Sequence, residues 1–166
     1  MPLRFENSPC VHAPLGLYSH TVCVPEGTEL LFISGQVGVR PDGTTPSTIA
    51  EQADQVFANL VALLEAHNLA PIDIVKLTTF MVSGQDGNAV RAARLKYLGS
   101  HRPASTAVYV SALVSPAWHV EIEAIAARCP RDNPVPRIGS LASKCNTRQG
   151  ARSNAMQVRS VRLGSI

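Results

Sequence analysis

The sequence contains few aromatic residues, few charged residues and no long apolar run. Aromatic side chains make up 5% of the 166 residues and charged side chains 16%, whereas 45% of the residues are hydrophobic. This composition is typical of a globular chain and excludes disorder for most of its length. No stretch approaches the roughly 18 consecutive apolar residues that a membrane-spanning helix requires, so we predict no membrane partner.

The four cysteines do not form the pattern of a disulfide framework or of a metal site. Cys10, Cys23, Cys129 and Cys145 include no CxxC pair, and no histidine stands at a spacing that would complete a tetrahedral site. Residues 1–14 contain three prolines and no apolar segment of the kind found in signal peptides. We therefore expect a reduced, cytoplasmic protein with no metal ion.

The five histidines and Ser34 form no known catalytic motif. No two histidines lie four residues apart on a predicted helix, and Ser34 is not part of a GxSxG elbow. Structural or surface roles are favoured for the five histidines, and Ser34 is not expected to act as a nucleophile. His20 is the most interesting of the histidines, because it follows Tyr18 and Ser19 closely.

The positive charge of the chain is confined to its end. Residues 1–130 contain 8 basic and 11 acidic side chains, a balance of −3, whereas residues 131–166 contain 7 basic and 1 acidic, a balance of +6. The second segment is rich in Ser, Arg, Asn and Gly and shows no regular period, which is typical of disorder. We expect one domain over residues 1–130 and a basic, disordered tail over residues 131–166. A nucleic-acid arm and a docking segment remain alternatives for the tail, while the acidic domain argues against a nucleic-acid partner.

Hydrophobic periodicity predicts five strands and two helices. The strands are expected at 17–24, 29–35, 75–82, 105–113 and 119–128, and the helices at 48–67 and 88–98. Thr48 and Glu51 stand in the register of a capping box at the start of the first helix. The first two strands are expected to be antiparallel. The order β-β-α-β-α-β-β predicts an α+β fold in which both helices cover one face of the sheet.

Alternation along the last two strands separates the two faces of this sheet. The even-numbered residues from Val120 to Ala126 are apolar and are predicted to pack beneath the helices, leaving Glu121 and Glu123 on the opposite face. In the preceding strand, Ser105 and Ala107 share one face. The polar face of the sheet is compatible with solvent exposure, with a subunit interface or with a site.

Five short motifs follow one another along the chain. They are Ser34-Gly35-Gln36; Glu51-Gln52 with Asn59-Leu60; Asp73-Ile74-Val75-Lys76; Arg102-Pro103-Ala104-Ser105-Thr106; and Val120-Glu121-Ile122-Glu123-Ala124-Ile125-Ala126. In this order they resemble the RidA/YjgF/YER057c/UK114 family of reactive-intermediate (imine and enamine) deaminases. The resemblance covers Ala13 to about Arg128.

The resemblance implies a chorismate-mutase-like fold with a mixed sheet. It also implies a homotrimer whose sheets form a central barrel, with three clefts between neighbouring subunits that receive a small imine or enamine. In typical members, a glutamate matching Glu121 helps a water molecule attack the imine carbon, and a tyrosine matching Tyr18 lines the cleft. Backbone groups near Ser34 and Gly35 hold the ligand, and Ala107 is expected to line the site beside them.

The chain departs from the family pattern at Ser105. In typical deaminases this position is an arginine that pairs with the carboxylate of the substrate, and this chain resembles the branches that lack it. Arg91 and Arg94 lie on one face of the second predicted helix, where Arg91 matches a position close to the cleft. Two solvated helix arginines are the alternative interpretation, and Arg102 is expected at an interface or on the surface.

Three functions remain open at this point. The first is a cofactor-independent hydrolase that deaminates an imine or enamine, with a specificity altered by Ser105. The second is a non-catalytic trimer that binds small metabolites. The third is the endoribonuclease activity attached to part of the family, for which only the basic tail could supply a phosphate-binding surface.

Overall fold

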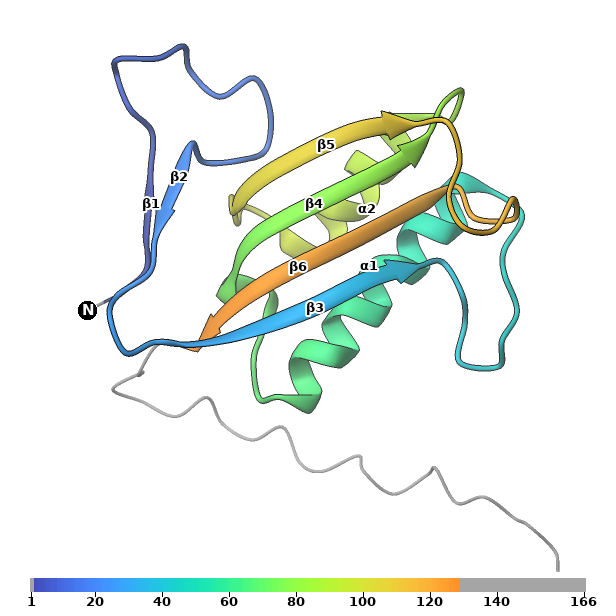
Figure 1. The fold of residues 1–166 in the computed structure, drawn as a ribbon, viewed down its shortest axis with the longest axis horizontal. Helices are drawn as coiled ribbons and strands as arrows, with labels where there is room; N and C mark the ends of the chain where they lie inside the picture. Colours follow the sequence, from blue (N-terminus) through green and yellow to red (C-terminus); the bar gives the residue numbers. More distant parts are fainter. Residues whose placement is uncertain (1, 129–166) are drawn as a thin grey trace, which may run out of the picture. The chain divides into compact units, whose positions relative to one another are not determined.

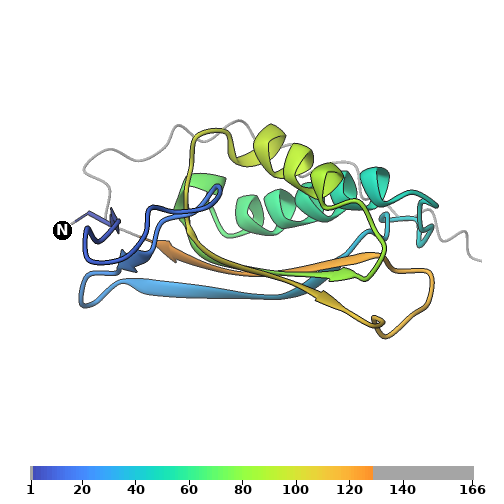
Figure 2. The same ribbon diagram turned by 90° about the horizontal axis from the view of Figure 1, so that it is seen from above.

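A mixed sheet covered on one face by two helices forms the body of the chain in a computed structural model, which describes residues 2–128 (Figures 1 and 2). The strands are β1 (Arg4–Glu6), β2 (Thr21–Cys23), β3 (Glu29–Val37), β4 (Ile74–Val82), β5 (Ala104–Val110) and β6 (Val120–Arg128). The helices are α1 (Ile49–Ala66) and α2 (Gly87–Leu98), with a short 3-10 turn, η1 (Pro71–Asp73), before β4. The predicted tail at 131–166 lies outside the described residues.

The main sheet has the strand order β3-β6-β4-β5. β6 is antiparallel to both β3 and β4, whereas β4 and β5 are parallel and are connected through α2. A parallel pair needs such a crossover, because a tight turn cannot return the chain to the same end of the sheet. The predicted α+β architecture, with a mixed sheet and both helices on one face, is confirmed (Figure 2).

The predicted pairing of the first two strands is wrong. β2 pairs with β1, in the register Phe5 to Val22, and β3 pairs with β6. The segment before β2 is tied elsewhere, since the Ser19 N–H donates to the Pro103 carbonyl at 3.4 Å. β1 was not predicted, because three residues are too few to show a period of two.

Both helices begin where side chains can satisfy their free N–H groups. In α1 the Thr48 hydroxyl accepts a hydrogen bond from the Glu51 N–H at 3.3 Å and donates to the Glu51 carboxylate at 2.7 Å. In α2 the Asp86 carboxylate accepts from the Asn88 N–H at 2.9 Å. α2 ends at Gly99, whose φ of +53° is a conformation that favours glycine.

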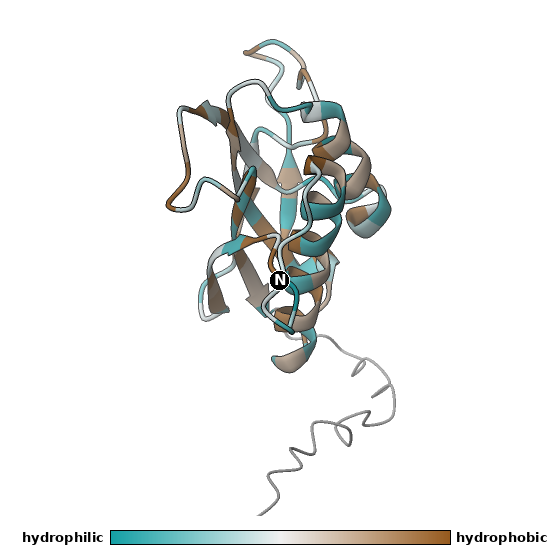
Figure 3. Cartoon of the chain, turned by 90° about the vertical axis from the view of Figure 1, so that its right-hand side faces the viewer, coloured by the Kyte–Doolittle hydropathy of each residue, from teal (hydrophilic) through white to brown (hydrophobic). Residues whose placement is uncertain are grey.

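The core lies between the helices and the sheet. The even-numbered residues of β6 from Val120 to Ala126 are at most 3% exposed beneath the helices, as predicted. The strands in Figure 3 are banded in brown and teal, as alternation of apolar and polar residues requires. Neither helix within residues 2–128 has the length and apolarity needed to cross a bilayer.

A fully buried glutamine, Gln52, links α1 to the loops beside the sheet. Its side-chain amide donates to the carbonyls of Pro46 and Ala117, both at 2.8 Å, and its oxygen accepts from the His119 N–H at 2.8 Å. A Cβ atom at Gly38 would lie 2.6 Å from Gln52 Cα, so a glycine allows α1 to approach the end of β3 this closely.

We predict that Gln52→Leu destabilises the domain by about 2–4 kcal/mol, because it leaves the buried Pro46 carbonyl, the Ala117 carbonyl and the His119 N–H without partners. Urea unfolding followed by circular dichroism measures the change. Gln55→Leu on the same helix is the matched control. Within residues 2–128 the Gln55 side chain bonds only to Asn59, at 2.7 Å, so this variant should cost less than about 1 kcal/mol. Equal losses in the two variants would contradict the assignment.

His101 makes the stability depend on pH. It is 8% exposed, its Nε2 lies 2.7 Å from the Ile74 carbonyl, and burial lowers its pKa against the opposing effect of that bond. The unfolded chain, with a histidine pKa of about 6.5, therefore binds the proton first on acidification, and stability falls as the pH drops below that value.

His101→Gln keeps a donor for the Ile74 carbonyl but cannot titrate. We predict a smaller loss of melting temperature between about pH 7 and pH 5 in His101→Gln than in the wild type, whereas the exposed His67→Gln control should behave like the wild type.

Candidate functional site

Glu121 lies on the open face of the sheet, against a glycine of the neighbouring strand. On β6 it stands between Val37 of β3 and Phe80 of β4. β3 is irregular between Ile33 and Gln36, and a Cβ atom placed on Gly35 would come within 1.8 Å of Glu121 Oε1. The absence of a side chain at Gly35 therefore leaves the space that the carboxylate occupies.

The Glu121 carboxylate is half-buried and has no hydrogen-bond partner within residues 2–128. In the adjacent irregular part of β3, the Gln36 side chain donates to the Ser34 carbonyl at 3.0 Å. A carboxylate held at a fixed place with its acceptor positions free can bind a water molecule or a ligand.

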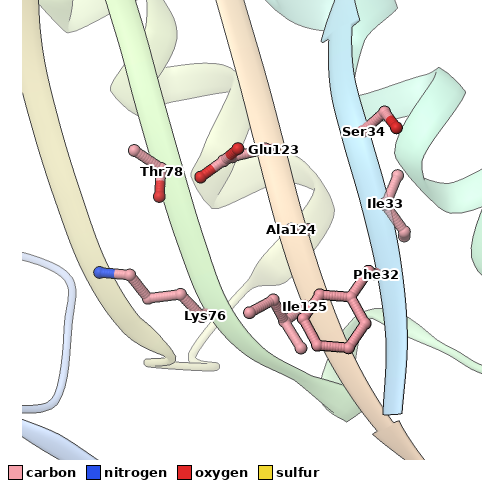
Figure 4. A pocket seen from close by; sticks show the side chains of 8 residues that line it. All are labelled: Phe32, Ile33, Ser34, Lys76, Thr78, Glu123, Ala124 and Ile125. Atoms are coloured by element: carbon pink, nitrogen blue, oxygen red, sulfur yellow. The ribbon is translucent and has the colours of Figure 1, made fainter.

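A shallow depression of about 220 Å³ lies beside this position on the same face (Figure 4). It is lined by residues of β3, β4 and β6: Phe32, Ile33, Ser34, Lys76, Thr78, Glu123, Ala124 and Ile125. In Figure 4 the Glu123 carboxylate points toward Thr78, while Lys76 points toward β5, where its Nζ donates to Thr106 at 2.7 Å. Ser34 is thus the one predicted site residue in the lining of this depression.

A second group of predicted residues gathers at the edge strand β5. Arg94 of α2 donates through Nη2 to the Ser105 hydroxyl at 3.0 Å and also to the Leu17 carbonyl. The Ser105 hydroxyl donates in turn to the Pro103 carbonyl at 3.1 Å. Burial lowers the pKa of Arg94 to about 10, and the like charge of Arg102 contributes to the shift.

Tyr18 belongs to the segment that contacts Arg94. Its hydroxyl accepts from the Leu15 N–H at 3.2 Å, and its ring centroid lies 6.1 Å from that of His20. Both ring nitrogens of His20 are buried and find no hydrogen-bond partner within residues 2–128. Tyr18 therefore lies next to Leu17, whose carbonyl accepts a hydrogen bond from Arg94.

The two groups lie on opposite faces of one sheet. Ser105 pairs with Leu77, which is buried beneath the helices, whereas Glu121 pairs with Phe80, three residues further along β4 and therefore on the open face. Two strand spacings across and three residues along separate their backbones by roughly 14 Å. Ser105 and Glu121 of one protomer therefore cannot hold the same small molecule.

The two helix arginines differ, and the interpretation of both as solvated is wrong for Arg94. Arg91 is exposed, while Arg94 is half-buried because it lies between Val90 and Leu98 at four-residue steps along the buried stripe of α2. The four-residue steps from Val90 to Arg94 and from Arg94 to Leu98 can be seen in the sequence, and they distinguish Arg94 from the exposed Arg91. Ala107 is exposed on the same face of β5 as Ser105.

Metal chemistry has no ligand set in the described part of the chain. Within residues 2–128 no group of three or more His, Cys, Asp or Glu side chains could hold a metal ion. Arg102, predicted on the surface or at an interface, is partly exposed and donates to the carbonyls of Gly99 at 2.8 Å and His101 at 3.0 Å.

Known proteins are similar to this chain over most of the residues that the structure describes. The family model described as endoribonuclease L-PSP matches residues 9–128. A 2-iminobutanoate/2-iminopropanoate deaminase of Dermatophagoides farinae is 32% identical over 126 residues, which cover 75% of this chain and 95% of that protein.

Two solved structures extend the comparison. YyfB of Yersinia pestis, a Rid-family protein, is 30% identical, with a TM-score of 0.69 over 77% of this chain and 100% of that one. TdcF of E. coli, solved with bound serine, is 28% identical, with a TM-score of 0.57 over 76% of this chain and 99% of that one.

We predict that Gly35→Ala moves the Glu121 carboxylate to another rotamer. The tip of a glutamate can rotate away from the added methyl group, so the loss of stability should stay below about 1.5 kcal/mol. A crystal structure of the variant measures the displacement. Gly16→Ala is the control, because its Cβ atom would lie at an ordinary contact distance of 3.8 Å from Tyr18. An unmoved Glu121 carboxylate in Gly35→Ala would contradict the close approach of Glu121 to Gly35.

Proposed function

Because the chain belongs to the RidA/YjgF/YER057c/UK114 family, we propose that it hydrolyses a small imine or enamine to a carbonyl compound and ammonia. The observation that carries this proposal is the Glu121 carboxylate, which lies against Gly35 and accepts no hydrogen bond from residues 2–128. The deaminase name of relatives at about 32% identity supports the same reaction.

In the proposed reaction Glu121 acts as a general base and then as a general acid. It accepts a proton from water as the water oxygen attacks the carbon of the protonated imine, which gives a neutral carbinolamine. It then gives this proton to the nitrogen, and it takes up the proton of the carbinolamine hydroxyl as the carbon–nitrogen bond breaks, so that ammonia leaves and the carbonyl forms. An enamine enters the same route after its carbon is protonated. Tyr18 and the backbone near Ser34 and Gly35 are proposed to position the substrate.

The proposal includes a cytoplasmic homotrimer. Ser105 and Glu121 lie on opposite faces of the sheet, so a site that uses both draws them from two copies of the chain. The open face exposes 70% of Phe32, 42% of Leu30 and 39% of Val108. Covering these apolar side chains with a neighbouring sheet would stabilise such an assembly.

A non-catalytic metabolite-binding protein is the second candidate. Ser105 supplies a neutral hydroxyl where typical family deaminases have an arginine, and the related TdcF was solved with serine bound. An endoribonuclease has less support, because residues 1–130 carry more acidic than basic side chains. The proposal also includes one domain over residues 1–130 and a basic tail over residues 131–166.

Ammonia release from enzymatically generated 2-iminobutanoate tests the proposal. We expect turnover by the full chain and a loss of at least about 100-fold in Glu121→Gln, because general acid–base catalysis contributes about 100-fold or more. Glu123→Gln is the matched control, since Glu123 lies two residues away on the same face. Binding of a small metabolite without turnover in any form would favour the second candidate, and equal losses in both variants would contradict the role of Glu121.

A further inference from the structure

Arg94 brings a guanidinium from α2 to the position on β5 at which the chain departs from the family pattern. Its Nη2 lies 3.0 Å from the Ser105 hydroxyl, and the same group donates to the Leu17 carbonyl. Its Nε is buried without an acceptor among the described residues. A guanidinium has five N–H donors, and the hydrogen bonds of Arg94 within residues 2–128 use Nη2, so the two N–H groups of Nη1 keep unused binding capacity.

Within residues 2–128, the positive charge of Arg94 is not matched by a carboxylate. The ion pairs formed within residues 2–128 join Arg4 to Glu6, Lys96 to Asp54 and Arg128 to Glu29. The acceptors of Arg94 are instead a neutral hydroxyl and a neutral carbonyl. A half-buried cation without a counter-ion is unfavourable by itself, and a bound anion would offset part of this cost.

We propose that Arg94 binds the carboxylate of a small ligand and takes the place of the arginine that typical family members carry at the position of Ser105. That this ligand is a 2-imino or 2-oxo acid rests on the proposed function. The anion-binding role rests on the geometry of Arg94 alone. Charge-assisted hydrogen bonds from a guanidinium to a carboxylate are about twice as strong as bonds between neutral groups.

Ser105 is complementary to this role. Its hydroxyl accepts from Arg94 and donates to the Pro103 carbonyl at 3.1 Å, so it orients the guanidinium without adding charge. An arginine at the same position would bring two like charges together on one strand edge. The serine and Arg94 therefore form one unit, in which the cation comes from the helix and not from the strand.

Among the described residues, no other arginine near β5 offers the same geometry. Arg91 is exposed. Arg102 already donates to the Gly99 and His101 carbonyls from its own loop. Only Arg94, among these three, contacts Ser105.

Isothermal titration of the full chain with 2-oxobutanoate and with the neutral ketone 2-butanone tests the proposal. The wild type should bind the acid at least about tenfold more tightly than the ketone, and Arg94→Gln should weaken acid binding at least about tenfold. Lys96→Gln removes a positive charge from the same helix at an exposed ion pair, and it should bind like the wild type. Adding Ser105→Arg to Arg94→Gln should restore part of the affinity, because both positions serve one subsite.

Two outcomes would overturn the proposal. The first is a wild type that shows no preference for the acid over the ketone, which needs no variant and is informative even if Arg94→Gln does not fold. The second is a folded Arg94→Gln whose affinity for the acid stays within about twofold of the wild type, because a charge-assisted bond contributes more than that. Arg94-dependent binding of the acid without ammonia release would refute the deaminase function and leave this inference standing.

Discussion

The position of β6 in the sheet determines most of what this molecule can do. β6 is the last strand in the chain, yet it lies between β3 and β4 and pairs with both. Its even-numbered residues fill the core beneath the helices, so its odd-numbered residues must face the other side. Glu121 is directed to the open face by this alternation, and a slip of one residue would bury its charge.

Local patterns in the sequence were sufficient for the main elements but not for all of their pairings. The helices at 48–67 and 88–98 and the strand at 119–128 were predicted to within one or two residues, because long segments show a clear period. The pairing of β2 with β1 was missed, since strand pairing depends on contacts distant in sequence. The three-residue β1 carried no period that could have suggested it.

The candidate site shows the same division between local and distant information. Glu121 was predicted from alternation and from the family resemblance. Its contact with Gly35 was not predicted, because the two residues are 86 positions apart in the sequence and such a contact leaves no local pattern. Arg94 was predictable in part, because it stands four residues from both Val90 and Leu98 on the buried stripe of α2. Its bond to Ser105 required the crossover that makes β4 and β5 parallel.

The separation of the two candidate groups connects the proposed catalysis with assembly. Arg94 and Ser105 lie on the helix side of the sheet edge, whereas Glu121 lies on the open face. The backbones of Ser105 and Glu121 are roughly 14 Å apart, across two strand spacings. A four-carbon imino acid is too short to reach both within one protomer. If Arg94 holds the carboxylate and Glu121 activates the water, the two must come from different copies of the chain, and a substitution that separates the copies must abolish turnover while leaving each protomer folded.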